Sequence, residues 1–510
     1  MAFSLRRSID LVRLGQSAVK LRSAQDDVAA AHARQTLIER MGKLRGLPQK
    51  LGQILAMGSS AGAADFRPLT DHAPAMPLWS AQQILEESWG VKIDEVIASI
   101  EEEGLAASLG QVHRATLHDG RNVAIKVRYP GIEKAVASDL SLLGWLSLPA
   151  GNLRRGFDMT SYREEILRDI EEELDYEQEA NHQRAFRLLA AELPSLIVPA
   201  LVDEWSSDRV LVTTWEQGVS IEEAASWSAN DRRTLARRLL LQFAHLAFDH
   251  GTLHADPHPG NYRFRLSNGE PEVVLYDFGS VLRLTDQERF GLIRLIHATA
   301  HDSDIDPYPL FLALGFDDRT LEPVRSKLPA LCRVLFEPFA TGVPYDLTRW
   351  NRAVRVADVL GDDRWNFRIS GPARLVFLMR AFHGLVYYLE RLGEPINWGW
   401  HVMPIIEKHL QAAQQLVLPE APPSDASMAH LAKHLCILVK ENGRTKASVT
   451  LPALAVDDLE AYVDEEVASK IRERGLSIPA MVQNARRRGY APGPVFDLED
   501  ADRSFRVWLA

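Results

Sequence analysis

Three polar side chains on two neighbouring segments have a spacing suited to phosphoryl transfer. HADPHPGN, at residues 254–261, carries Asp256 and Asn261, and the LYDFG segment places Asp277 just after the apolar run at 273–276. Phosphoryl transfer needs one acid that orients the attacking hydroxyl or water, and an amide and a second acid that hold Mg²⁺ on the phosphates. We therefore predict Asp256 at the catalytic-base position and Asn261 and Asp277 as metal ligands.

The order of these residues, H-x-D-x₄-N followed by D-F-G, is that of the catalytic and metal loops of protein kinases. Upstream, Lys126 is the one charge in the apolar strand pattern VAIKV. A buried ammonium needs a partner, and nucleotide phosphates with a helix carboxylate would supply it. The alternative is a lysine on the solvent face of an edge strand.

The partner carboxylate is expected from a long acidic helix at residues 160–192. Glu173, Asp175 and Glu179 are the candidates, and at 100° per residue Asp175 and Glu179 share a face. His254 and His258 flank Asp256 without further ligands at metal-binding spacing, so we expect His254 to support the loop structurally.

The turn expected over the phosphates is rich in alanine, with Ala106, Ala107 and Ser108 where protein kinases carry a glycine-rich loop. Methyl groups restrict φ and ψ and limit how closely backbone amides approach phosphate. Nucleotide handling should therefore differ from that of ordinary kinases. No A-P-E tripeptide follows Gly279, so a peptide-docking platform is not expected.

Bulk properties indicate a soluble globular chain long enough for more than one core. The 510 residues are 46% hydrophobic and 25% charged, and the net charge of −11 argues against a general nucleic-acid binder. Residues 1–50 carry ten Lys/Arg and four Asp/Glu, a local +6. This segment is compatible with a basic amphipathic helix on an anionic membrane, a transit peptide or a helix packed on the body. No apolar run is long enough to span a membrane, and the two cysteines are expected to be buried thiols in a cytoplasmic protein.

The pattern along the chain predicts an α+β, bilobal, protein-kinase-like fold. An N-terminal helical extension (1–78) precedes a strand-containing N-lobe (79–217) and a largely helical C-lobe (218–417), with a hairpin turn at Asp119-Gly120. A linker at 418–427 leads to a C-terminal helical segment (428–510).

Six segments together resemble a known family. KLGQ at 50–53, AASLGQVHRA, VAIKVRYPGI, ELDYEQEAN, HADPHPGN and DFG are similar to the motifs of the UbiB family of atypical protein-kinase-like ATPases, which supports ubiquinone and other isoprenoid-lipid metabolism. A weaker resemblance lies at 374–392. The likeness covers about residues 40–285.

The resemblance implies a role for each matched position. Lys126 would contact phosphates and pair with Glu179, and the Ala-rich turn would lie over the nucleotide. The regulatory extension, with Lys50, Gly52 and Gln53, would cover the active site. Glu173 would be a polar neighbour of this extension, and Asp175 is assigned to the same regulatory set of residues.

The implied cofactors are Mg²⁺ and ATP or ADP, and the implied reaction is ATP hydrolysis or phosphorylation of a small molecule. A lipid or quinone-precursor ligand and peripheral membrane contact are further expectations. The alternatives are an antibiotic-type small-molecule phosphotransferase and a nucleotide-gated scaffold for a biosynthetic assembly.

Overall fold

The computed structural model describes residues 76–107, 109–133, 159–500 and 503–510. It divides the chain into two compact units. Of the described residues, unit 1 comprises 76–107, 109–133, 159–246, 252–283 and 373–394, and unit 2 comprises 247–251, 284–372, 395–500 and 503–510. Every described residue of the predicted site belongs to unit 1.

An antiparallel sheet forms the N-terminal part of unit 1. Its path is β1-β3-β4-β6, with β2 paired to β3. The strands are β1 (Ile97–Ile100), β2 (Leu105–Ala106), β3 (Gly110–Leu117), β4 (Asn122–Arg128) and β6 (Val210–Thr214). The predicted hairpin is confirmed, since β3 and β4 pair across a turn in which Gly120 has φ 88°. Alternate residues Val123, Ile125 and Val127 of β4 are fully buried, as period-2 burial requires.

Helix α5 (Leu78–Trp89) covers this sheet through Ala81 and Leu85, both fully buried, and a short helix α6 (Ile93–Val96) follows. Gly90 ends α5 in the left-handed conformation with φ 70°, which glycine adopts without steric cost.

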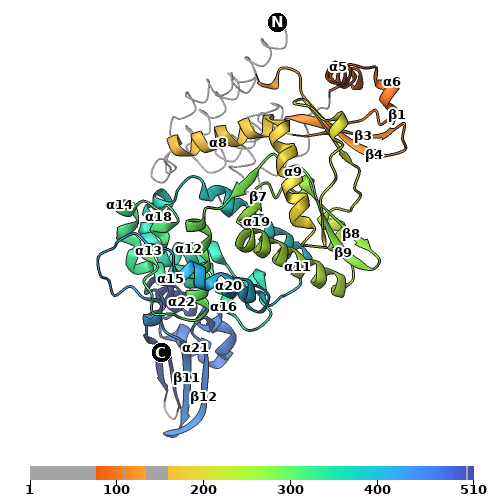
Figure 1. The fold of residues 1–510 in the computed structure, drawn as a ribbon. Coiled ribbons are helices and arrows are strands. Elements are labelled where there is room, and N and C mark those ends of the chain that lie inside the picture. Colours follow the sequence, from red (N-terminus) through yellow and green to blue (C-terminus); the bar gives the residue numbers. More distant parts are fainter. Residues whose placement is uncertain (1–75, 108, 134–158, 501–502) are drawn as a thin grey trace, which may run out of the picture. The chain divides into compact units, whose positions relative to one another are not determined.

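The acidic segment at 160–192 is two helices, so the prediction of one continuous helix is wrong. Helix α8 (Met159–Leu174) ends at Leu174. Asp175 separates it from α9 (Tyr176–Ala190). Asp175 has φ −95° and ψ 90°, and its side chain accepts hydrogen bonds from the backbone amides of Glu177 and Gln178. Aspartate is a strong N-cap, and this local bond competes with helix continuation. Figure 1 shows the chain changing direction between α8 and α9.

The remainder of unit 1 carries the loops around Asp256 and Asp277. A three-stranded sheet has the order β5-β9-β8, and β7 pairs with β10. These strands are β5 (Leu196–Ile197), β7 (Thr252–His254), β8 (Tyr262–Ser267), β9 (Glu270–Leu275) and β10 (Val281–Arg283). The accompanying helices are α10 (Ile221–Ala224), α11 (Ala229–Ala244) and α19 (Leu375–Leu392).

Unit 2 begins as a helical array. Its helices are α12 (Asp286–Ala300), α13 (Tyr308–Ala313), α14 (Asp318–Leu321), α15 (Leu328–Leu335), α16 (Glu337–Ala340), α17 (Arg352–Leu360), α18 (Arg364–Ser370) and α20 (Trp398–Gln414). Cys332 on α15 is buried and Cys436 is half-buried, and both are free thiols. In the described part of the chain, no helix combines the length and apolar character needed to cross a bilayer.

The prediction that residues 428–510 are helical is wrong. Four strands form an antiparallel sheet in the order β12-β11-β14-β13. They are β11 (His434–Glu441), β12 (Arg444–Pro452), β13 (Gly493–Asp500) and β14 (Arg503–Leu509), with α21 (Glu465–Glu473) and α22 (Ile478–Arg487) between β12 and β13. Asn442 (φ 50°) and Gly443 (φ 75°) join β11 to β12, and an Asn-Gly pair with positive φ is a strong hairpin signal.

Candidate active site

The loop that carries Asp256 begins at strand β7 and is anchored by His254. The His254 side chain is buried, and its Nε2 is 2.6 Å from the backbone oxygen of Asp277. The ring packs edge-on against Phe186, Tyr262 and Phe278. Burial lowers the pKa of His254, which favours the neutral imidazole. His254 thus ties the two loops together, the structural role predicted for it.

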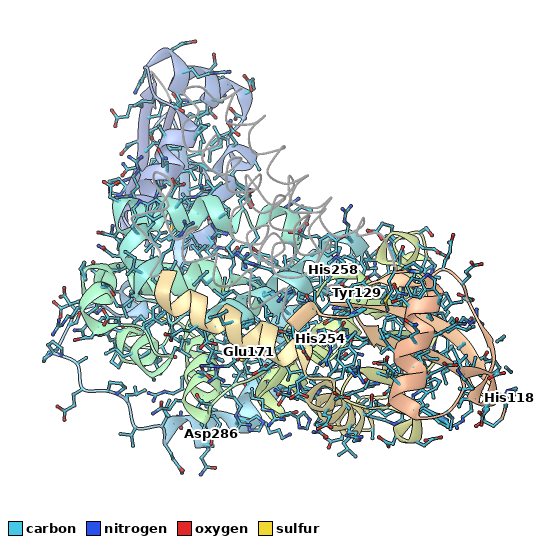
Figure 2. All side chains as sticks on the ribbon, turned by 90° about the horizontal axis from the view of Figure 1, so that it is seen from above. His118, Tyr129, Glu171, His254, His258 and Asp286 are labelled. Atoms are coloured by element: carbon cyan, nitrogen blue, oxygen red, sulfur yellow. The ribbon has the colours of Figure 1, made fainter. Side chains whose placement is uncertain are left out.

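His258 has a local role in the same loop. Its Nδ1 accepts a hydrogen bond from the amide of Gly260 at 3.0 Å and caps the short turn at Pro259–Asn261. Figure 2 shows His118 at the outer edge of the N-terminal sheet, away from His254 and His258. Across the described ranges, no group of three or more His, Cys, Asp or Glu side chains is arranged to hold a metal by itself.

Asn261 and Asp277 are neighbours because they flank paired strands. Tyr262, the first residue of β8, pairs with Leu275, the last residue of β9, and the amide of Tyr276 donates to the Asn261 backbone oxygen at 2.8 Å. Asp277 has φ 57°, an uncommon conformation for a residue other than glycine. Its Oδ1 accepts from the Gly279 amide at 3.2 Å, which fixes the carboxylate direction.

These two side chains fit the chemistry of Mg²⁺. Mg²⁺ takes oxygen ligands and is usually held by one or two protein groups together with substrate phosphates and water. Asn261 Nδ2 donates to Asp256, at 3.2 Å to its backbone oxygen and 3.1 Å to Oδ2, so the amide Oδ1 is the oxygen available as a ligand. A carboxylate and an amide oxygen are therefore positioned at the end of one strand pair.

Lys126 lies at the centre of a charge cluster. Its Nζ is 2.8 Å from both carboxylate oxygens of Glu179 and 3.0 Å from Asp277 Oδ2. The ammonium also lies 5.2 Å from the ring centroid of Tyr176. The side chain of Glu179 is 1% exposed and that of Lys126 is 12% exposed. The alternative of a solvent-facing lysine is excluded, and the N-terminal sheet, α9 and the DFG loop converge on one amine.

Each charge in this cluster changes the pKa of the others. Burial alone would lower the pKa of Lys126, but the Asp277 and Glu179 carboxylates raise it well above its usual value. Burial raises the pKa of Glu179 to about 7 despite the attraction of Lys126, and the Asp277 charge adds to the rise. Burial also opposes ionisation of Asp277, yet the Lys126 ammonium lowers its pKa. A cationic lysine and an ionised Asp277 are the forms that phosphate and metal binding require.

Asp256 is held by groups from two elements. One carboxylate oxygen, Oδ2, accepts from Asn261, and Oδ1 forms an ion pair with Arg380 of α19. Arg380 was missed in the sequence, where it lies in the predominantly apolar middle of a helical run. Tyr176 was also missed, although it lies in the ELDYEQEAN segment. Its ring faces Lys126.

The alanine turn closes on itself. The Ala107 amide donates to the Gly110 backbone oxygen at 2.9 Å, and Ala106 pairs with Gln111 across β2 and β3. Gly110 is required for a different reason, because a Cβ there would lie 2.5 Å from the Val127 oxygen and 2.7 Å from the Tyr176 hydroxyl. The Ala107 amide is thus committed to the turn, and Ser108 lies outside the described residues.

The remaining predicted residues fall into three groups. Glu173 is buried beside the DFG loop, with its Cγ 3.3 Å from the position a Cβ would take at Gly279. Asp175 is the exposed cap of α9 and does not share a helix face with Glu179. Lys50, Gly52 and Gln53 lie outside the described residues.

The chain that carries this arrangement is similar to known proteins. Residues 68–306 match the model of the ABC1 atypical kinase-like domain. This matched segment is similar to ABC1 atypical kinase-like domains. It is 28% identical to the rat mitochondrial atypical kinase COQ8B over 64% of this chain and 62% of that protein. It is 32% identical to AarF domain-containing protein kinase 1 of Xenopus tropicalis over 48% and 50% of the two chains.

The solved structure of Rv3197 from Mycobacterium tuberculosis, in complex with erythromycin, is 25% identical to this chain. The match has a TM-score of 0.53 and covers 75% of this chain and 98% of that one. These relatives confirm the predicted resemblance to the UbiB family and the protein-kinase-like fold. The chain spans about half to three-fifths of the length of the two relatives cited above, COQ8B and AarF domain-containing protein kinase 1.

Proposed function

We propose that this protein binds a magnesium nucleotide at Lys126, Glu179 and Asp277 and hydrolyses ATP or transfers its terminal phosphoryl group to a small molecule. The observation that carries the proposal is the position of the Lys126 ammonium between the buried carboxylate of Glu179 and the half-buried carboxylate of Asp277. A lysine fixed in this way can turn toward phosphate oxygens while Glu179 remains its partner.

The other residues would act at defined atoms. Asp277 and the Asn261 amide oxygen would hold Mg²⁺, which neutralises charge on the phosphates when bound. Asp256 would orient the hydroxyl or water that attacks the terminal phosphorus, because its carboxylate belongs to the same loop as Asn261. Because the Ala107 amide already donates to the Gly110 backbone oxygen, the phosphates would have one backbone donor fewer on the side of the alanine turn.

The acceptor class is proposed from the relatives. COQ8B and the family likeness support a role in isoprenoid-lipid or quinone metabolism, with a lipid or quinone-precursor ligand and a peripheral membrane location. The extension with Lys50, Gly52 and Gln53 would then restrict access of a protein substrate. A second candidate, a phosphotransferase acting on an antibiotic-like molecule, is favoured by the erythromycin complex of Rv3197.

One assay separates these candidates. The protein would be incubated with Mg²⁺ and ATP labelled at the terminal phosphate, alone, with a phenolic quinone precursor in vesicles, or with a macrolide. We expect label as inorganic phosphate, increased by the quinone precursor. Transfer of label to the macrolide would favour the second candidate. Lys126→Arg should abolish turnover, whereas Lys92→Arg, on a side chain that is 71% exposed, should not. Wild-type protein that neither binds nor turns over ATP would refute the proposal.

A further inference from the structure

Helix α19 lies along the loop that carries Asp256. Arg380, Gly384 and Tyr388 are spaced four residues apart and therefore share one face of the helix. Arg380 forms the ion pair with Asp256, and the Tyr388 hydroxyl donates to the Pro257 backbone oxygen at 3.0 Å. Between them, Gly384 packs so closely that a methyl group there would overlap the Pro257 ring. The contact is continuous over two helical turns.

The grouping of the chain agrees with this contact. Residues 373–394 belong to unit 1 with the catalytic and metal loops, whereas their sequence neighbours 284–372 and 395–510 belong to unit 2. The match to the ABC1 domain model ends at residue 306, so α19 lies beyond it. The helix that contacts the predicted catalytic loop is thus supplied from outside the matched segment.

The charges give the contact a specific consequence. The Arg380 side chain is 2% exposed and that of Asp256 is 15% exposed, so the pair is largely removed from water. Hydrogen bonds between ionised groups are stronger and more directional than neutral ones. With Arg380 on Oδ1 and Asn261 on Oδ2, rotation of the Asp256 carboxylate is restricted from both sides. An acid that orients an attacking hydroxyl needs this restriction, because small misplacements reduce rates strongly.

We infer that Arg380 is a positioning residue for Asp256 and that α19 is part of the catalytic unit, an inference that rests on the proposed function. Arg380 acts through the carboxylate of Asp256 and does not belong to the nucleotide-binding cluster at Lys126. A purely structural ion pair would instead contribute to folding alone. The two cases differ in what Arg380 substitution does once Asp256 has already been changed.

The test is a double-mutant cycle on the full chain. Arg380→Gln should lower the turnover of Mg-ATP by about 100-fold and leave its Kd unchanged. Arg380→Lys, which keeps the charge, should lose less. In an Asp256→Asn background, Arg380→Gln should add almost nothing. Arg391→Gln, at the exposed end of the same helix, is the matched control and should behave as wild type. Additive losses, or a loss of nucleotide affinity equal to the loss of turnover, would overturn the inference.

Hydrogen exchange gives a readout that does not depend on turnover. In Arg380→Gln, amides of residues 254–261 should exchange faster while those of β4 are unchanged. Unchanged exchange in this loop would overturn the positioning role. Absence of nucleotide binding in wild type would instead refute the proposed function. If Arg380→Gln does not fold, Arg380→Lys carries both comparisons.

Discussion

The metal assignment predicts that Asp277→Asn separates folding from nucleotide binding. In the protein without nucleotide, Asp277 Oδ2 is 3.0 Å from Lys126 Nζ. Coulomb's law gives this pair about 5–6 kcal/mol of attraction at an effective dielectric of 20. The Asp277 charge, however, also repels Glu179 and Asp256, as their mutual effects on pKa indicate. Because the substitution removes attraction and repulsion together, we expect unfolding free energy to change by only about 1–2 kcal/mol.

The effect on bound nucleotide should be much larger. Ligand at 100 times its Kd stabilises the wild type by about 2.7 kcal/mol. That corresponds to a rise in Tm of roughly 5–10 °C, at about 2–4 °C per kcal/mol. If loss of the carboxylate weakens Mg-nucleotide binding by about 100-fold, the same ligand concentration leaves about 0.4 kcal/mol, or about 1 °C. Thermal melts with Mg-ADP, with and without a chelator, measure this difference.

The control is Asp203→Asn, an acid of unit 1 whose side chain is 64% exposed and paired with Arg184. It should retain the wild-type shift. An Asp277→Asn protein that keeps the full Mg²⁺-dependent shift would refute the metal assignment, because the carboxylate charge would then contribute nothing to binding. An Asp277→Asn protein that does not fold without ligand would contradict the expectation that the lost attraction to Lys126 is largely offset by the lost repulsion from Glu179 and Asp256.

Three further predictions concern other parts of the site. Ala107→Gly should change the relative affinity for ADP and ATP, because glycine allows the turn to open toward phosphate; equal ratios in titration calorimetry would contradict this. Asp175→Ala should reduce unfolding free energy by about 1 kcal/mol in urea, while Asp175→Ser, which still caps α9, should lose less; equal losses would exclude the cap. The pKa of Glu179 is raised from 4.5 to about 7, so its contribution to stability is complete below pH 4.5 and is lost as pH rises through 7. Wild type should therefore lose about 3 kcal/mol between pH 5 and 8 relative to Glu179→Gln; a constant difference in urea denaturation would contradict this.

The proximity of Lys126 to Glu179 and of Asn261 to Asp277 could be predicted because these residues stand in local patterns. Asp256, Asn261 and Asp277 follow or precede short apolar strands, and strand pairing brings them together. Lys126 is the single charge in the apolar pattern VAIKV, so its need for a partner could be predicted. These features depend on spacing over a few residues, which can be read directly from the sequence.

Features that depend on competition between patterns were predicted less well. Asp175 lies within a run of helix-forming acids, and helix periodicity concealed its strength as an N-cap. In the C-terminal segment, helices α21 and α22 agree with the helical prediction, but the Asn442-Gly443 hairpin joins two strands that precede them. In both places a short capping or turn preference determines the local backbone within a longer segment that was predicted to be helical.

The contact between Arg380 and Asp256 could not be predicted from residue spacing. It is separated from Asp256 by more than a hundred residues, and only the packing of α19 on the loop joins them. A cation in the apolar middle of a helix indicates that a buried partner exists, but it does not identify the partner. Tertiary packing supplies that information.

The most direct test of the central claim is a crystal structure with Mg²⁺ and a non-hydrolysable ATP analogue. We predict a metal about 2.0–2.1 Å from oxygens of Asn261 and Asp277 and from the phosphates, with Lys126 Nζ on phosphate oxygen and still bonded to Glu179. A nucleotide bound elsewhere, or a metal with no contact to either residue, would contradict the account.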